Sequence, residues 1–341
     1  MAVDVRAGQA RGGVVGQVLG TIGRSRELTL VALMIVLALA VTTQAPQFLS
    51  ESNLTQVTTL AAIIAIASVG EALVIITKNV DLSVESMVGL VAFVVADILR
   101  QHMLPMPAAW VAGALIGLAL GMVNGTIIGF FRVPSIVATL GTLSIFRGLV
   151  FFIAGGKQMD LADLPPGYSD PASQTVLGIP MFVIVGFVVV VIVATVMRYT
   201  RFGRRTYAVG SNVEAATILG VRSRLHVFAA LSICGLLAGV AGVLWGMEFG
   251  TIYATSASGI SLQIIAGAVV GGVSIAGGTG TVVGAALGAL FLALVNNALL
   301  VLLLPQELLQ AVYGLVILVA VSADAVIQRR QQRRATREYS L

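Results

Sequence analysis

Residues 60–76 read Leu60-Ala-Ala-Ile-Ile-Ala-Ile-Ala-Ser-Val-Gly70-Glu-Ala-Leu-Val-Ile-Ile76, with Glu71 as the one ionisable side chain. An unbroken apolar run of this kind is typical of a helix that crosses the hydrocarbon core of a bilayer. Similar runs recur along the chain of 341 residues, of which 58% are hydrophobic and only 10% are charged. Soluble domains carry about 25% charged residues. Because the runs are continuous, rather than alternating as in a β-barrel, the sequence predicts an all-α integral membrane protein.

The apolar runs predict about ten transmembrane helices. Their expected ranges are 28–44, 56–77, 84–100, 106–130, 134–154, 178–197, 225–249, 260–276, 281–303 and 308–327. The third and the eighth are short or interrupted by glycine and need not cross completely. Together the spans form one transmembrane domain, 28–327, between a polar N-terminal arm, 1–27, and a basic C-terminal tail, 328–341.

Basic residues predict the orientation, because cytoplasmic loops carry an excess of Lys and Arg. An even number of spans places both termini on one side, and both termini are rich in Arg. The residues assigned to the cytoplasm on this basis are Arg6, Arg11, Arg24, Arg26, Lys78, Arg132, Arg198, Arg201, Arg204, Arg205, Arg222, Arg224, Arg329, Arg330, Arg333, Arg334 and Arg337. The long loop 155–177 then lies outside; it contains Asp160, Asp163 and Asp170 and is a candidate docking surface.

The segment 204–224 is polar although it lies between two long spans. Ser211 and Glu214 have the spacing of a capping box, in which the two residues satisfy each other's free backbone N–H groups. Gly220 stands where a left-handed residue commonly ends a helix. We therefore expect a short capped helix, which either lies against the membrane or fits into a groove on a cytoplasmic partner. The residues assigned to it are Gly210, Ser211, Asn212, Glu214, Ala215, Ala216 and Gly220.

A polar stretch, 77–84, interrupts the apolar sequence that extends from Leu60 to Leu99. Its Asp81 and Ser83 either line a polar path through the membrane or cap the helix that follows. Three polar residues of neighbouring spans are assigned to the same path: Asn124, Thr139 and Thr142.

Glu71 and Arg147 are ionisable residues within or near the ends of predicted spans. Such groups are costly in lipid and usually face a bundle interior or a water-filled path. Arg147 could also snorkel towards the interface or pair with a structural partner. Both residues are therefore candidates for a functional or a structural role.

Catalytic and cofactor-binding patterns are missing from the sequence. It contains two His and a single Cys, Cys234, and no H-E-x-x-H, clustered carboxylate pair or G-x-S-x-G motif. The glycine-rich stretch 266–280 lacks the Lys and the Ser or Thr of a phosphate-binding P-loop. We therefore expect no enzyme activity, no metal site and no ATP bound by this chain.

Glycines recur at intervals of about four residues, which places them on one helix face and allows close contact with another helix. The series are Gly113, Gly117, Gly121, Gly125 and Gly129; Gly235, Gly239, Gly242, Gly246 and Gly250; and Gly280, Gly284 and Gly288. The first and third series have similar surroundings and lie about half a chain apart. This similarity favours a two-half internal repeat, as in many transporters.

Four blocks give the chain a family resemblance. They are Val74-Ile-Ile-Thr-Lys-Asn-Val-Asp81-Leu-Ser-Val84; Val133-Pro-Ser-Ile-Val-Ala-Thr-Leu-Gly-Thr-Leu-Ser-Ile-Phe-Arg147-Gly148; Ala208-Val-Gly-Ser-Asn212-Val-Glu214-Ala-Ala-Thr-Ile-Leu-Gly220-Val221; and Gly271-Gly-Val-Ser-Ile-Ala-Gly-Gly-Thr-Gly280. With these blocks the chain resembles the permease subunits of bacterial ABC importers for monosaccharides. The resemblance is to the ribose, rhamnose and autoinducer 2 types within the branched-chain amino acid and sugar permease superfamily.

The resemblance implies a type II ABC importer-like permease in the bacterial inner membrane. It implies a dimer with a second permease subunit, either a copy of this chain or a sister chain, around a central pathway. ATP and Mg²⁺ would bind to ATPase subunits on separate chains, and an extracytoplasmic sugar-binding protein would deliver the substrate. The segment 204–224 matches the family's cytoplasmic coupling segment. The net charge of +5 does not indicate nucleic acid as a partner, since the Arg residues cluster at span ends.

The chain departs from the family pattern at several places: Lys78-Asn79 stand where Gly-Gly is common, and Ser211 and Val213 replace the usual Gly and Pro of the coupling segment. Glu85 replaces a common Gly, which leaves the local turn open. The family's Glu-Leu-Asp-x-Ile-Ala block reads Ser261-Leu262-Gln263-Ile264-Ile265-Ala266, so two carboxylates are absent. The rival interpretation is a stand-alone secondary carrier driven by an ion gradient, with Glu71 and Asp81 as its ion-binding candidates.

Overall fold

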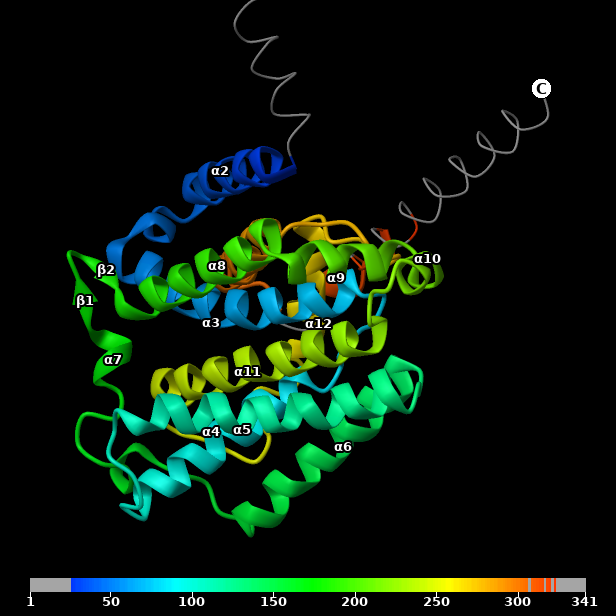
Figure 1. Cartoon of the computed structure of the whole chain (residues 1–341). Helices are drawn as coiled ribbons and strands as arrows, with labels where there is room; N and C mark the ends of the chain where they lie inside the picture. Colours follow the sequence, from blue (N-terminus) through cyan, green and yellow to red (C-terminus); the bar gives the residue numbers. More distant parts are fainter. Residues whose placement is uncertain (1–25, 306–307, 316, 320–321, 323–341) are drawn as a thin grey trace, which may run out of the picture.

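A computed structural model of the chain describes residues 26–305, 308–315, 317–319 and 322 (Figure 1). The N-terminal arm up to residue 25 and the basic tail 328–341 lie outside the described residues. The elements are, in order, α2 (Arg26–Gln44), η1 (Pro46–Leu49), α3 (Glu51–Ile76), α4 (Val84–Arg100), α5 (Ala108–Gly125), η2 (Thr126–Phe130), α6 (Ser135–Ala154), η3 (Leu161–Asp163), α7 (Asp170–Ser173), β1 (Thr175–Val176), β2 (Ile179–Pro180), α8 (Met181–Tyr199), α9 (Arg201–Ser211), α10 (Val213–Ile218), α11 (Ser223–Phe249), α12 (Ile260–Val270) and α13 (Val282–Val301).

Seven of the described helices are long and apolar enough to cross a membrane: α2, α3, α5 continued by η2, α6, α8, α11 and α13. This confirms the all-α membrane fold. The two spans that were expected to be short are short, since α4 has 17 residues and α12 has 11. An apolar helix at 308–319 runs partly over residues outside the described set. The number of ten spans therefore stays a prediction.

Different elements lie at the two ends of the bundle (Figure 1). At one end, which we call the hairpin end, lie α7 and the two-stranded antiparallel pair β1–β2. At the other end, which we call the α10 end, lie α9 and α10. The loops, helix termini and α9 at the α10 end contain the basic residues Lys78, Arg132, Arg198, Arg201, Arg204, Arg205, Arg222 and Arg224. The long loop at the hairpin end carries the three Asp residues named above.

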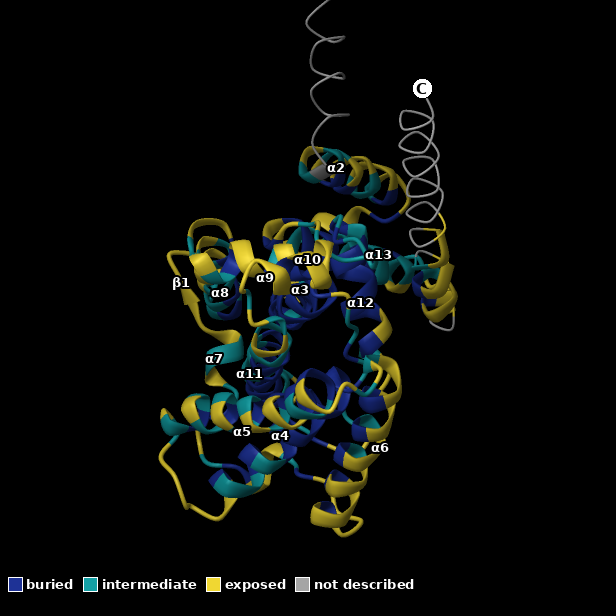
Figure 2. Ribbon diagram, turned by 45° about the vertical axis from the view of Figure 1, so that its right-hand side comes forward, coloured by how far each residue is buried: buried dark blue, intermediate teal, exposed yellow. Residues whose placement is uncertain are grey.

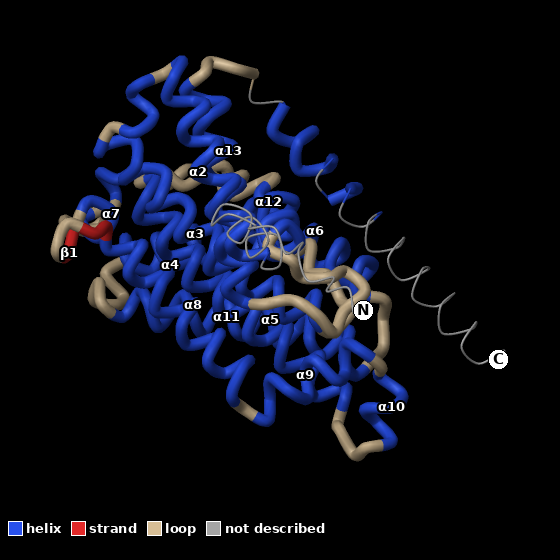
Figure 3. The backbone as a smooth tube through the Cα atoms, turned by 90° about the horizontal axis from the view of Figure 1, so that it is seen from above, coloured by secondary structure: helices blue, strands red, loops and turns tan. Residues whose placement is uncertain are grey.

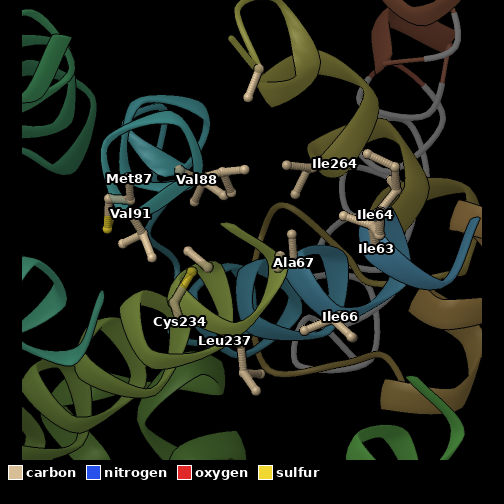
Figure 4. Close-up of a cluster of buried hydrophobic side chains, with 14 of the residues drawn as sticks. Ile63, Ile64, Ile66, Ala67, Met87, Val88, Val91, Cys234, Leu237 and Ile264 are labelled. Atoms are coloured by element: carbon tan, nitrogen blue, oxygen red, sulfur yellow. The ribbon is translucent and has the colours of Figure 1, made fainter. Parts of the chain in front are cut away.

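α3 runs through the middle of the bundle and is buried along most of its length (Figure 2). α11 packs against α3, α4 and α5. In the core, Cys234 of α11 lies beside α4, and Ile264 of α12 approaches α3 (Figure 4). Apart from the short hairpin and the loops, the trace is helical throughout (Figure 3).

The predicted glycine series mark the places where helices touch. An added Cβ at Gly117 would collide with the backbone of Gly235 and lie 2.6 Å from the Cα of Gly239. α5 and α11 therefore pack backbone against backbone, as the spacing predicts. α12 and α13 make the same kind of contact through Gly271 with Gly284 and Gly267 with Gly288. The two-half repeat stays a prediction.

Candidate functional site

The polar segment 204–224 contains the end of α9 and the whole of α10, with the single residue Asn212 between the two helices. Asn212 has extended backbone, with φ −154° and ψ 104°, and its Oδ1 accepts a hydrogen bond of 3.0 Å from the N–H of Ala215. Asn212 is therefore the N-cap of the short helix. The predicted capping box of Ser211 and Glu214 is wrong.

The cap lies one residue later than predicted because α9 continues through Ser211. Gly210 lies so close to the end of α3 that an added Cβ would collide with the carbonyl oxygen of Ile76. The same Cβ would lie 2.6 Å from the backbone nitrogen of Gly278. Gly278 in turn donates its N–H to the Ile76 carbonyl at 2.9 Å. The sequence around residue 204 did not predict α9, because its packing partners lie far away along the chain.

α10 exposes an apolar tip. Ile218 is 85% exposed and Leu219 is 82% exposed, while Ala216 is buried. The helix ends as predicted: Gly220 has φ 79°, and the N–H of Val221 bonds back to the Ala216 carbonyl at 3.0 Å. A left-handed glycine thus ends the helix directly after the apolar tip.

α9 is hydrogen-bonded to residues 76–78 and to residues 271–280. We call these three segments together the α9 junction. The hydroxyl of Tyr207 donates to the carbonyl of Gly280 at 2.8 Å, and Nζ of Lys78 donates to the carbonyl of Ser211 at 3.4 Å. Burial raises the pKa of Tyr207 above its ordinary value. A Tyr hydroxyl is already protonated at neutral pH, and the raised pKa extends its role as a donor to more alkaline conditions.

Asp81, Ser83 and Asn124 come together in the interior and have no exposed surface. Asp81 Oδ1 accepts from the hydroxyl of Ser83 at 2.6 Å and from its N–H at 2.9 Å. Asn124 Nδ2 donates to Asp81 Oδ2 at 3.1 Å and to Ser83 Oγ at 2.8 Å. Glu71 Oε1 accepts from the N–H of Asp81 at 3.0 Å, and its Oε2 lies 3.9 Å from Sγ of Cys234. We call these five residues the buried polar cluster.

Asp81 and Ser83 of the buried polar cluster lie between the end of α3 and the start of α4. Ser83 is the residue before α4, and its side chain makes no capping bond. Ser83 therefore does not cap α4. Asp81 accepts the N–H of Ser83, two residues further on, as an N-cap side chain does, and it also accepts the Ser83 hydroxyl. Of the two capping alternatives, the structure thus supports the one with Asp81.

Thr139 and Thr142 lie on α6 and are also buried. The Thr139 hydroxyl donates to the Ser135 carbonyl at 2.8 Å and lies 3.4 Å from the Val80 carbonyl. All the predicted path residues are at most 3% exposed in the single chain. Within the described residues no group of three or more His, Cys, Asp or Glu is arranged to hold a metal ion.

Arg147 points from α6 into the chain and does not snorkel. Its Nη1 donates to the carbonyls of Ala254 at 3.0 Å and Ser256 at 2.8 Å, and its Nη2 lies 3.8 Å from Oε1 of Glu85. Glu85 was missing from the predicted site residues. The conformation around Glu85, which the sequence did not settle, is regular helix, since α4 begins at Val84. The available signal was a carboxylate in an apolar stretch, which needs a partner such as the embedded Arg147.

Residues 53–321 match the family model described as branched-chain amino acid transport system / permease component. The chain is 33% identical over 317 residues to the autoinducer 2 import system permease protein LsrC of Shigella flexneri, a match that covers 93% of this chain and 92% of that protein. The LsrC protein of Salmonella typhi is 33% identical, with 93% and 90% covered. That of Escherichia coli (strain K12 / DH10B) is 32% identical, with 93% and 92% covered. No solved structure shows a significant match. The chain therefore belongs to the family of branched-chain amino acid transport system permease components.

Proposed function

We propose that the chain is the transmembrane permease subunit of an ABC importer for a monosaccharide or a similar small polyol-like substrate, of the rhamnose, ribose or autoinducer 2 class. The similar proteins are permeases of autoinducer 2 import systems, which supports both the direction and the class of transport. The chain moves its substrate across the inner membrane without altering it. ATP and Mg²⁺ are bound by ATPase subunits on separate chains.

The observation that carries this proposal is the apolar tip of α10, which the α9 junction holds in place. Large apolar side chains exposed together at a polar end of a molecule mark a contact with a protein or with the membrane. The match of this segment to the family's coupling segment favours a protein partner. A partner that moves Ile218 and Leu219 also moves α9, because only Asn212 separates the two helices. α9 bonds directly to the turn after α3 and to the segment after α12. Motion driven by ATP outside the membrane can thereby reach the break between α3 and α4.

The α10 end faces the cytoplasm in this proposal, because its basic residues follow the positive-inside pattern. Both termini are then cytoplasmic. The hairpin end is extracytoplasmic, and its acidic loop receives the sugar-binding protein. A second permease subunit, identical or a sister chain, completes the central pathway. The pathway residues stay those predicted from the sequence: Asp81, Ser83, Asn124, Thr139 and Thr142.

The first test is capture of the partner from the native membrane in mild detergent, with the tagged chain as bait and mass spectrometry as the readout. The variant combines Ile218→Glu with Leu219→Glu, which places charge on the tip. The matched control is Leu177→Glu, because Leu177 is 97% exposed in the hairpin at the opposite end. We expect an ATPase to be captured with the native chain and with the control, and to be lost with the tip variant.

Other outcomes separate the alternatives. Capture that survives the tip variant would keep the importer and move the ATPase contact away from α10. No ATPase with the native chain, together with uptake that an uncoupler abolishes, would favour the secondary carrier. Glu71 and Asp81, which the structure places in direct contact, would then be its ion-binding candidates.

A further inference from the structure

The Glu85 carboxylate holds the start of α12. Its Oε2 accepts three hydrogen bonds: from the N–H of Gly259 at 2.9 Å, from the N–H of Ser261 at 3.2 Å and from the hydroxyl of Ser261 at 2.8 Å. The first N–H groups of a helix have no partner within the helix. A carboxylate at this position satisfies them and also interacts favourably with the positive end of the helix dipole. Glu85 therefore ties the first turn of α4 to the first turn of α12.

The second oxygen of the same carboxylate faces α6. Oε1 of Glu85 lies 3.8 Å from Nη2 of Arg147, and that Nη2 is buried with no hydrogen-bond partner. Nη1 of Arg147 holds the carbonyls of Ala254 and Ser256, in the segment that leads into α12. One carboxylate thus faces the start of α12 with one oxygen and α6 with the other.

Close packing brings the segment before α12 against α4. An added Cβ at Gly89, one turn after Glu85, would lie 2.6 Å from the carbonyl oxygen of Ser256 and 3.2 Å from Nη1 of Arg147. α6 packs mainly on α4. Glu85, Arg147, Ser261 and the segment 254–259 form what we call the Glu85 clamp.

α12 links the clamp to the α9 junction. It has 11 residues, which span about 16 Å at the usual helix rise. This length is about half of a hydrocarbon core of roughly 30 Å. The clamp holds its first residues, and its last residues lead into the segment 271–280 that bonds to α9. α12 is thus held by the clamp at its start and is linked to α9 through the segment that follows its end.

We infer that Glu85 is a positioning residue that anchors α12 and α6 to α4, so that motion of α9 is converted into motion around the buried polar cluster. This inference rests on the proposed coupling to an ATPase. The structure places the Glu85 carboxylate in contact with the Ser261 side chain. The clamp needs one carboxylate, which either position can supply.

The experiment uses the whole transporter, permease with ATPase and binding protein, in proteoliposomes, and measures substrate taken up per ATP hydrolysed. The variants are Glu85→Gly, Glu85→Gln, Ser261→Glu and the exchange Glu85→Gly with Ser261→Glu. The matched control is Glu51→Gln, an exposed carboxylate in the first turn of α3. We expect Glu85→Gly and Glu85→Gln to lower uptake per ATP about fivefold or more, as loss of a typical coupling does. We expect the exchange to restore it to within about twofold, and the control to leave it unchanged.

A second readout, the melting temperature of the purified chain, needs no ATPase. Recovery of both readouts in the exchange supports the positioning role. If the exchange restores the melting temperature but not the uptake per ATP, the carboxylate has only a structural role and the inference is overturned. An uptake per ATP that is unchanged in Glu85→Gln would overturn it as well. If the exchange fails while native uptake stays driven by ATP, only the inference falls. If the native complex shows no uptake driven by ATP, the proposed function falls and the coupling role falls with it.

Discussion

At the scale of residues, the buried polar cluster concentrates two carboxylates in the interior of the chain. Glu71 and Asp81 are fully buried, and within the described residues neither forms an ion pair with Lys, Arg or His. N–H, hydroxyl and amide donors bond to both oxygens of Asp81 and to Oε1 of Glu71, while Oε2 of Glu71 faces the Cys234 thiol at 3.9 Å. Polar groups buried in this way are costly unless they are bonded. The cluster is consequently both a structural feature of the break after α3 and a candidate part of the transport path.

We predict that Glu71→Gln lowers transport more than it lowers the amount of protein in the membrane. Gln keeps a side-chain oxygen that can accept the N–H of Asp81, and it removes only the ionisable group. Glu71→Leu removes the acceptor as well and is expected to lower both quantities. Uptake assays paired with quantitative blots of the same membranes test this. Equal losses of transport and abundance in Glu71→Gln would assign Glu71 a structural role alone.

Sequence reasoning at this scale found the embedded charges and missed their partners. Glu71 and Arg147 stand out because each is ionisable within an apolar run. Glu85 was noted from the sequence only as a departure from the family pattern, because its partner Ser261 is 176 residues away in the chain. The prediction of Ser211 as the cap is wrong for a related reason. The local pattern suits a capping box, but α9 continues through Ser211, where Gly210 packs against Ile76 of α3.

At the scale of elements, close packing of α5 on α11 follows from the glycine spacing. We predict that Gly117→Ala destabilises the purified chain by about 1–3 kcal/mol, because the added Cβ meets backbone atoms that cannot move independently. The matched control is Gly141→Ala on α6, where an added Cβ meets nothing within 4 Å. Ala is the better helix former, so this control should be neutral or slightly stabilising.

Thermal unfolding of the two purified variants in one detergent measures the difference. A melting temperature of Gly117→Ala equal to that of the native chain would show that α5 and α11 can separate without cost. The packing seen between Gly117 and Gly235 would then contribute little to stability.

At the scale of the whole molecule, the two ends differ in charge and in exposed apolar residues, which allows the orientation to be tested. Cys234 is fully buried, so the native chain should react poorly with a thiol reagent. We predict that Leu177→Cys is labelled by a membrane-impermeant maleimide in intact spheroplasts, and that Ile218→Cys is labelled only after permeabilisation. Leu177 and Ile218 are 97% and 85% exposed, so neither label should be limited by burial.

The labelling pattern decides between the two orientations. The reverse pattern would place α10 outside and would contradict both the positive-inside assignment and the contact with a cytoplasmic ATPase. Equal labelling of both positions in intact spheroplasts would indicate leaky membranes, and a cytoplasmic marker protein controls for this leakage. The native chain controls for labelling of Cys234.

The sequence by itself determined the features that depend on composition and local order. A charged fraction of 10% excludes a soluble fold, continuous runs require helices, glycine spacing predicts helix contact faces, and Gly220 ends α10 because a left-handed backbone favours glycine. These properties can be read from neighbouring residues.

Only the tertiary structure decided what those elements bring together. α9 is a helix that ends at Ser211. Glu71 and Asn124 both bond to Asp81 in the segment between α3 and α4. Glu85 contacts the start of α12 and Arg147 of α6 with the same carboxylate. Each of these arrangements depends on hydrogen bonds or close backbone contacts between segments from different helices. Side-chain hydrogen bonds act over about 3 Å in space and have no fixed spacing in sequence, so periodicity cannot reveal them.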